Sequence, residues 1–362
     1  MLIRLFVLAW SAVALWAQAL SPARQQEFEK LISQEMSRQN IPGLSAAVAS
    51  GGEIAWSAGF GLSDVENFVP AKAATVYRLG SVSKPITAVA LLQLWEAGKI
   101  DLDAPIQRYV PSFPHKPWPV TVRELLGHLG GIRHYDGQPE INSTRHYPEL
   151  AAALRIFQDS PLAAEPGTRF LYTTYGYVLL GVAIESASQM RFMDYLRARI
   201  FGPAGMDRAR QDHVYAIIPN RARGYALSST GQVQNCSLAD TSNKIPGGGL
   251  AATAEDLVKF GLAVRSAKLL KSSTLDMMFT SQKTRDGKPT DYGMGWNISA
   301  TNRRKVVSHT GGQQGVSTIL VMVPRDGIVV ALMCNLERAS LRELAQKIAQ
   351  SLVTEPISRA KQ

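Results

Sequence analysis

Ser81 and Lys84 are the two residues of this chain whose types and spacing most directly suggest chemistry. They stand three positions apart, so on a helix they would lie on one face, about one turn from each other. Such an arrangement brings an amine to a hydroxyl, and a serine needs a neighbouring base before it can act as a nucleophile. The pattern alone is weak evidence, because Ser-x-x-Lys recurs at Ser358 and Lys361 in the polar C-terminal tail, where we interpret it as accidental.

The apolar run 86–95 follows directly and predicts the element that positions this pair. Only Thr87 and Gln93 are polar in it, so a helix here would be apolar nearly all round and therefore buried. Pro85 has no N–H and fits best in the first turn of a helix, which places Ser81 at or just before the helix N-terminus. A serine there is close to unpaired backbone N–H groups and to the positive end of the helix dipole.

Two later stretches carry further polar side chains of suitable types. Tyr172 stands just before a predicted helix, where its phenol could reach a serine and pass a proton. His309 stands where a predicted strand ends in Gly311 and Gly312, and these glycines leave the backbone open to close approach by a substrate. A single tyrosine is usually a packing residue and a single histidine is unremarkable, so these residues gain meaning only in combination with the Ser-x-x-Lys pair.

Hydrophobic periodicity predicts an α+β fold around these residues. The order is a hairpin, the buried helix, a helical insertion, an antiparallel meander and a closing helix. This order predicts an antiparallel sheet flanked by helices with an inserted all-helical lobe, and a catalytic cleft at their junction. The predicted strands are 44–50, 53–59, 292–299, 305–309, 316–323 and 328–334, with a turn at 324–327. Beyond the central helix, the predicted helices are 25–38, 121–128, 149–158, 175–189, 192–200 and 340–352.

The same pattern predicts how the chain is divided. Residues 1–19 read as a secretory signal, with Arg4 as its positive start, an apolar stretch at 5–16 and Ala17-Gln-Ala19 as the cleavage site. We expect a mature protein that starts at Leu20 and is periplasmic or extracellular. An apolar stretch of 12 residues is short of the ~20 that span a membrane, so no stable anchor is expected after cleavage. The predicted domains are an α/β subdomain formed by 20–101 and 245–362, and a mainly helical subdomain, 102–244.

Composition excludes several classes of function. A chain of 362 residues with 46% hydrophobic and 19% charged residues is ordinary for a globular protein. The formal charge of +10 comes from scattered lysines and arginines, which favours a solvated surface, or attraction to anionic envelope polymers, over a nucleic-acid partner. No His-Glu-x-x-His or His-x-His implies a metal, and no Gly-x-Ser-x-Gly suggests an α/β-hydrolase. Cys236 and Cys334 could pair in an oxidising compartment, and the sequence leaves that open.

Taken together, the three stretches resemble the serine β-lactamase and penicillin-binding-protein superfamily. The similarity is to the branch related to class C β-lactamases, D-alanyl-D-alanine peptidases and the mitochondrial β-lactamase-like serine proteases. Ser81-Val-Ser-Lys84 matches the first motif, Tyr172-Thr-Thr174 the second and His309-Thr-Gly311 the third. The resemblance extends from about residue 41 to 352 and includes the stretches 125–131, 247–256 and 292–296.

The resemblance implies a role for each matching residue and no cofactor. Ser81 would form an acyl-enzyme on an ester or amide, with Lys84 or Tyr172 as the base that takes its proton. A lysine buried against the apolar helix and near a second cation could be neutral enough for this. The Ser81 N–H and a backbone N–H after His309 would form the oxyanion hole, at about 3 kcal/mol per donor. The implied substrate-binding residues are His309, Thr310, Gly311 and Thr174.

Two departures from the motifs bear on the substrate. The second motif usually ends in asparagine, whose amide is missing at Thr174. The third is usually Lys-Thr-Gly or His-x-Gly, and with His309 the fixed cation of the lysine form is missing. Both changes point away from an efficient β-lactamase and toward an esterase or peptidase, as in the mitochondrial protease-like members. A D,D-carboxypeptidase, a weak β-lactamase, a catalytically silent peptide-binding protein and a filament-forming protein remain as alternatives. The expected partner is a small-molecule or peptide substrate, with cell-wall peptides among the candidates, and the oligomeric state stays open.

Overall fold

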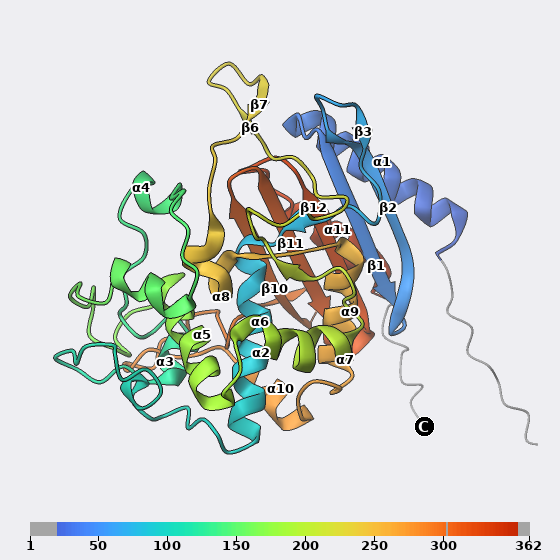
Figure 1. Ribbon diagram of the computed structural model, residues 1–362. Helices are drawn as coiled ribbons and strands as arrows, with labels where there is room; N and C mark the ends of the chain where they lie inside the picture. The colour runs from blue at the N-terminus through green and yellow to red at the C-terminus, as the bar shows by residue number, and fades with distance from the viewer. Residues whose placement is uncertain (1–19, 302, 354–362) are drawn as a thin grey trace, which may run out of the picture.

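A seven-stranded antiparallel sheet forms the centre of the molecule (Figure 1). The computed structural model describes residues 20–301 and 303–353, so the predicted signal and the second Ser-x-x-Lys lie outside the described residues. The strand order is β3-β2-β1-β12-β11-β10-β9, which pairs the N-terminal hairpin with the last strand of the chain. The strands are β1 (Gly43–Ser50), β2 (Glu53–Asp64), β3 (Val69–Pro70), β9 (Asn297–Thr301), β10 (Arg304–Gln313), β11 (Val316–Val323) and β12 (Ile328–Cys334).

Helices cover both faces of this sheet. Successive residues of a strand point to opposite faces, and in β12 both sets are buried. Val329, Ala331 and Met333 belong to the core that contains α2 (Ser83–Glu96) and α9 (Ala254–Arg265). Val330, Leu332 and Cys334 belong to a second core, formed with α1 (Pro22–Gln39) and α11 (Arg342–Leu352). The sheet is therefore the middle layer of three.

A lobe of short helices and loops lies beside the layer that contains α2 (Figure 1). Its longest helix, α5 (Tyr175–Ser188), packs against α2. The other helical elements between Leu102 and Gly249 are η2 (Ile106–Arg108), α3 (Val122–Leu126), α4 (Gln138–Ile141), η3 (Leu150–Ile156), α6 (Phe192–Leu196), η4 (Arg197–Phe201), α7 (Gly202–Ala204), η5 (Thr241–Lys244) and α8 (Ile245–Gly248). Helix α10 (Ser272–Met278) follows α9.

Two small sheets complete the fold. The first pairs β4 (Tyr77–Arg78) and β5 (Arg210–Gln211) with β8 (Leu250–Ala252), and so joins the segment before α2 to a strand within the lobe and to the strand that follows it. The second is the hairpin of β6 (Tyr225–Leu227) and β7 (Val233–Asn235), which projects at the top of Figure 1. No helix among the described residues is long and apolar enough to cross a membrane.

The predicted α+β architecture is confirmed, with corrections to single elements. The predicted strand 292–299 is wrong in its first half, because the strand begins at Asn297 and the preceding Gly295 has φ +85°, which packs it against Ala88 of α2. Strand β10 continues past His309 to Gln313. The predicted helix 149–158 is a 3-10 helix, and the turn at 324–327 is a 3-10 turn, η6 (Pro324–Asp326). Both cysteines are free, so the pairing left open by the sequence is absent.

Candidate active site

Ser81 and Lys84 meet at the start of the central helix. Ser81 lies in a single 3-10 turn, η1 (Gly80–Val82), that runs directly into α2. Lys84 Nζ lies 3.1 Å from Ser81 Oγ, which is hydrogen-bonding distance. The lysine has no exposed surface, whereas Ser81 is only half-buried. The Ser81 hydroxyl is therefore accessible while the amine beside it is shielded from water.

The partners of Lys84 fit a neutral amine. Besides Ser81, its Nζ contacts Gly247 O at 2.8 Å and Thr174 Oγ1 at 3.2 Å. A neutral amine has two N–H donors for Gly247 and Thr174, and one lone pair that accepts from the Ser81 hydroxyl. Burial lowers the pKa of Lys84 well below its usual value, and the charge of Lys244 lowers it further. The arrangement therefore directs the lone pair of a neutral Lys84 at Ser81 Oγ.

Tyr172 lies against this pair. Its ring centre is 4.7 Å from Lys84 Nζ, and its phenol lies near enough to the Ser81 hydroxyl for that group to influence its pKa. Burial raises the pKa of the Tyr172 phenol above its usual value, and the neighbouring Ser81 hydroxyl opposes that rise only in part. A phenol that keeps its proton is suited to donate one, so the geometry favours Lys84 as the base and Tyr172 as the acid.

The His309 side chain is already bonded within the protein. Its Nδ1 donates to Thr310 O at 2.7 Å, because a carbonyl can only accept, and its Nε2 therefore accepts from the Tyr292 hydroxyl at 2.9 Å. The imidazole is 2% exposed. Burial is the largest cause that lowers the pKa of His309, to about 3. The sequence placed His309 among the substrate-binding groups, but neither ring nitrogen is free to contact a substrate.

The end of β10 brings backbone groups to the nucleophile. A Cβ on Gly311 would stand 2.0 Å from Leu79 O, so only glycine allows the strand to lie this close to the turn that holds Ser81. Gly80, directly before the serine, has φ +50°, and a Cβ on it would be 2.9 Å from Gly312 N. The amide of Gly312 therefore lies beside the turn of Ser81. The resemblance implies that Thr310 binds substrate. In the structure its backbone carbonyl accepts from His309 Nδ1.

Several groups at the site were not assigned a role from the sequence. The His128 and His134 Nδ1 atoms accept from the backbone N–H groups of Thr173 and Thr174, each at 3.2 Å, and so fix the second motif. Burial lowers the pKa of both imidazoles, that of His134 to about 4. His128, Tyr292 and Gly247 lie in the three stretches 125–131, 292–296 and 247–256 that carried the resemblance. The resemblance of these stretches to the family could therefore have pointed to the three residues.

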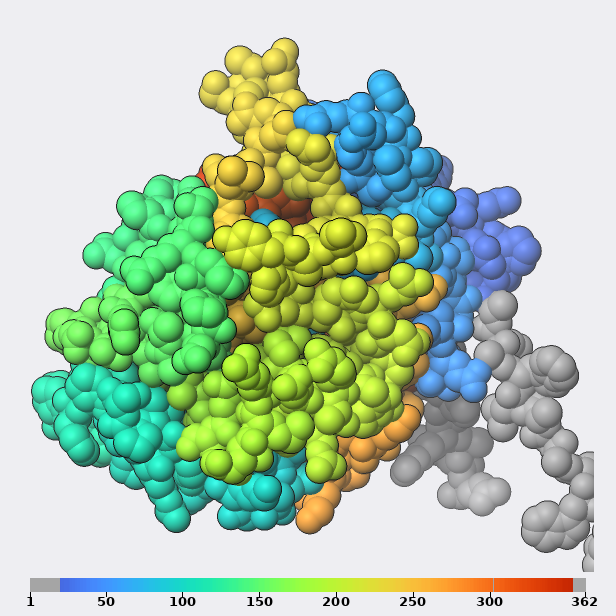
Figure 2. Space-filling model, viewed as in Figure 1, coloured from blue at the N-terminus to red at the C-terminus, as the bar shows by residue number. Residues whose placement is uncertain are grey.

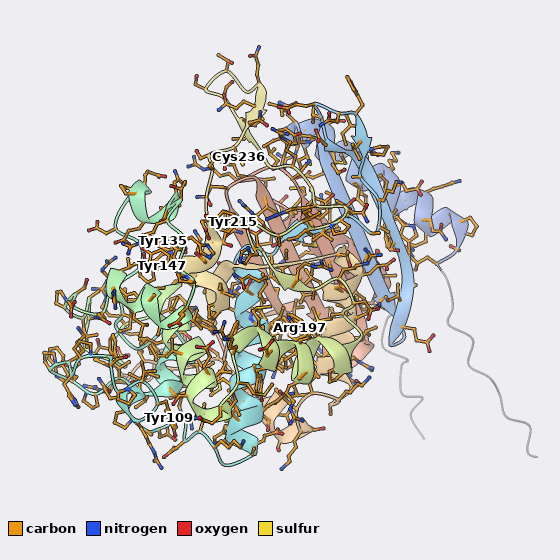
Figure 3. The ribbon with its side chains drawn as sticks, viewed as in Figure 1. Tyr109, Tyr135, Tyr147, Arg197, Tyr215 and Cys236 are labelled. Atoms are coloured by element: carbon orange, nitrogen blue, oxygen red, sulfur yellow. The ribbon has the colours of Figure 1, made fainter. Side chains whose placement is uncertain are left out.

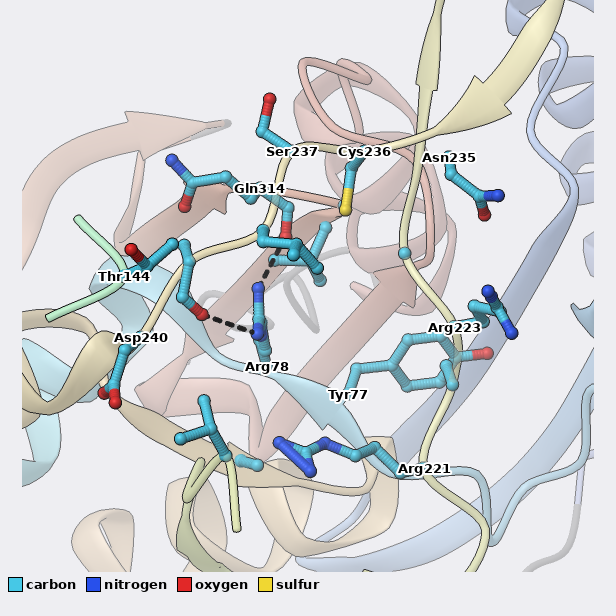
Figure 4. Close-up of a pocket in the computed structure, with 18 of the residues that line it drawn as sticks. Tyr77, Arg78, Thr144, Arg221, Arg223, Asn235, Cys236, Ser237, Asp240 and Gln314 are labelled. Atoms are coloured by element: carbon cyan, nitrogen blue, oxygen red, sulfur yellow. Dashed lines mark hydrogen bonds between the residues drawn. The ribbon is translucent and has the colours of Figure 1, made fainter. Parts of the chain in front are cut away.

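Open space continues past the end of β10. A cavity of about 460 Å³ is lined by Gly312, Gln313 and Gln314, and it shares Gln314 with a neighbouring cavity of about 770 Å³. In the larger cavity, Arg78 donates to Gln314 O at 3.2 Å and to Ala239 O at 3.3 Å (Figure 4). Figure 2 shows a hollow on this face with red atoms of the C-terminal strands at its floor. The smaller cavity thus comes close to the Ser81 turn through Gly312.

The fold and the serine–lysine site together define a class: this is a serine hydrolase of the β-lactamase and penicillin-binding type. Residues 28–353 match the family model described as Beta-lactamase, and the chain belongs to that family. It is 31% identical to the human mitochondrial serine beta-lactamase-like protein LACTB, over 85% of this chain and 76% of that protein. It is 30% identical to penicillin-binding protein 4* of Bacillus subtilis, over 75% of this chain and 63% of that protein.

Solved structures show the same fold. The octameric penicillin-binding protein homologue from Pyrococcus abyssi superposes with a TM-score of 0.79 at 27% identity, covering 92% of this chain and 78% of that one. The D-amino acid amidase from Ochrobactrum anthropi superposes with a TM-score of 0.78 at 23% identity, covering 91% of this chain and 98% of that one. The second likeness concerns the fold alone.

Proposed function

We propose that this serine hydrolase cleaves esters or peptide-type amides through an acyl-enzyme on Ser81. The observation that carries the proposal is the set of three partners around Lys84 Nζ, which leaves the lone pair of a neutral amine directed at Ser81 Oγ. A positioned base contributes about 10²- to 10⁴-fold to such a reaction.

The residues divide the reaction between them. Lys84 accepts the proton of Ser81 as Oγ attacks the substrate carbonyl. The negative oxygen that forms is stabilised by the N–H groups of Ser81 and Gly312, with about 3 kcal/mol from each donor. Tyr172 donates its proton to the leaving group and is reprotonated by Lys84. Water, deprotonated by the same base, then hydrolyses the acyl-enzyme and restores Ser81.

Two features support an ester or peptide over a β-lactam. Thr174 offers a hydroxyl to Lys84 where the motif usually places an amide for the substrate. His309 is neutral and internally bonded, so its side chain provides no cation for a substrate carboxylate. The similarity to penicillin-binding protein 4* supports a second candidate, a D,D-carboxypeptidase or weak β-lactamase.

A substrate panel tests this function. We expect kcat/KM for p-nitrophenyl acetate to exceed that for nitrocefin, and Ser81→Ala to abolish both activities. Ser83→Ala is the matched control. It removes a buried hydroxyl at the start of α2, and that hydroxyl accepts from Leu250 N and is not a partner of Lys84. Ester hydrolysis undiminished in Ser81→Ala would contradict the mechanism. A wide margin in favour of nitrocefin, or of a D-alanyl-D-alanine peptide, would select the second candidate.

We also propose that the protein is exported, from the signal predicted at residues 1–19. N-terminal sequencing of protein recovered from its native host should begin at Leu20. A first residue of Met1 would contradict export with cleavage.

A further inference from the structure

Lys244 is a second buried lysine next to the active site. It ends the 3-10 turn η5, directly before α8, and is 2% exposed. Its Nζ donates to Ile141 O at 3.1 Å and lies 5.2 Å from the ring centre of Tyr135, which is labelled in Figure 3. Among the residues that the structure describes, no carboxylate lies within ion-pair distance of Lys244. A carbonyl and an aromatic ring therefore hold this amine.

The short helix α8 connects the two lysines. Gly247 O accepts from Lys84 Nζ at 2.8 Å, and the side chain of Lys244 passes 3.8 Å from where a Cβ on Gly248 would stand. A second connection runs through the ring of Tyr135, which stacks on His134 at 4.2 Å between ring centres. These contacts place both amines around one turn of backbone, inside the protein.

The groups that face Lys84 are neutral. They are the hydroxyls of Ser81 and Thr174, the aromatic rings of Tyr172 and Tyr177, and the imidazoles of His128, His134 and His309. Within the described part of the chain, no carboxylate pairs with Lys84. A positive charge on this amine therefore has no opposite charge to offset the loss of water.

The groups around Lys244 are charged. Arg78 disfavours a positive charge on it, while Asp212 and Asp240 favour one. Burial is the largest influence and lowers the pKa of Lys244 to about 8, so this amine is still mainly protonated at neutral pH. Because two nearby cations in a poorly solvated interior repel each other, the proton remains on the lysine that has carboxylates nearby.

We propose that Lys244 is a positioning residue of the active site, whose positive charge keeps Lys84 unprotonated and so ready to accept the proton of Ser81. It touches neither Ser81 nor the substrate and acts through Lys84. The inference rests on the proposed function, because it assumes that Lys84 is the base.

The test follows the pH dependence of Ser81 itself. A fluorophosphonate probe labels the nucleophile without the choice of a substrate, and its second-order rate constant is measured from pH 5 to 9. Lys244→Gln keeps a donor for Ile141 O but removes the charge. In this variant the acidic limb of the rate–pH profile should move to higher pH by about 0.5 to 1 unit. At pH values below the midpoint of this limb, the labelling rate constant should be roughly 3- to 10-fold lower than in the wild type. The rate constant on the alkaline plateau should stay unchanged. Lys244→Arg keeps the charge and should retain the wild-type limb.

Lys259→Gln is the matched control, since it removes the charge of a lysine paired with Asp207 on the surface. Coincident acidic limbs in wild type and folded Lys244→Gln would overturn the inference. Absence of any label on Ser81 in the wild type would instead overturn the proposed function.

If the variant does not fold, NMR titration of the 13C-labelled lysines of the wild type decides. A protonated Lys84 beside a neutral Lys244 at pH 7 would contradict the inference.

Discussion

Thr174 Oγ1 and Lys84 Nζ lie 3.2 Å apart, so the last residue of the second motif contacts the base. Thr174 is 3% exposed, and its backbone N–H is held by His134. The hydroxyl is therefore fixed at the amine and is not free in the cleft. A threonine here helps to orient the lone pair of Lys84 toward Ser81.

The first prediction concerns this contact. Thr174→Val keeps the shape of the side chain but leaves one N–H of buried Lys84 unpaired. We expect kcat/KM for p-nitrophenyl acetate to fall roughly 5- to 30-fold, mainly through kcat. This corresponds to a loss of about 1 to 2 kcal/mol of transition-state stabilisation. Thr174→Ser retains the hydroxyl and should stay within about 3-fold of wild type. Equal activity of the valine and serine variants would show that the contact does not orient the base.

The second prediction compares two adjacent glycines of β10. A methyl group on Gly311 would stand 2.0 Å from Leu79 O, whereas one on Gly312 would meet nothing within 4 Å. Gly311→Ala should therefore lower the free energy of unfolding by about 3 kcal/mol, because backbone must move. Gly312→Ala should stay within about 1 kcal/mol of wild type. Urea unfolding of both variants measures this, and similar losses in the two would refute the close approach of β10 to the Ser81 turn.

The main architecture could be predicted from the sequence because its signals are local. Strand β12 is a continuous apolar run, β11 is apolar from Ile319 onward, and the helix at 83–96 is apolar on nearly all sides. The predicted division into domains remains a prediction. The strand predicted at 292–299 failed because period-two patterning cannot show that Gly295 adopts a positive φ to pack against α2.

The site could be predicted only in part. Ser81 and Lys84 are three positions apart in one short stretch of chain, so their contact could be predicted from the sequence alone. Lys244 is 160 residues further along the chain, and nothing in its local sequence marks it as the second cation near Lys84. The bond of His309 to Tyr292 could not be predicted either, because the pattern gives only the position of His309 near the strand end. Contacts between distant segments account for both gaps.

The last prediction follows from the burial of neutral His309. The pKa of this imidazole is about 3 in the folded protein and ~6.5 in an unfolded chain. Between these values the unfolded chain binds one proton more at this residue, so folding stability falls as pH falls. The contribution is fully present above pH ~6.5 and is lost progressively toward pH 3, at about 1.4 kcal/mol per unit.

Urea unfolding at pH 7 and pH 5 isolates this effect, because most carboxylates stay ionised over that interval. Between pH 7 and pH 5, the free energy of unfolding of His309→Gln should fall by about 2 kcal/mol less than that of the wild type. This difference does not depend on the stability of the variant at pH 7. His134, with a pKa of about 4, and His128 continue to contribute in the variant, so some dependence remains. His115→Gln, at an exposed position, should keep the wild-type difference. An unchanged difference in His309→Gln would mean that His309 is not buried as a neutral imidazole, and the electrostatic description of the Lys84 environment would have to be revised.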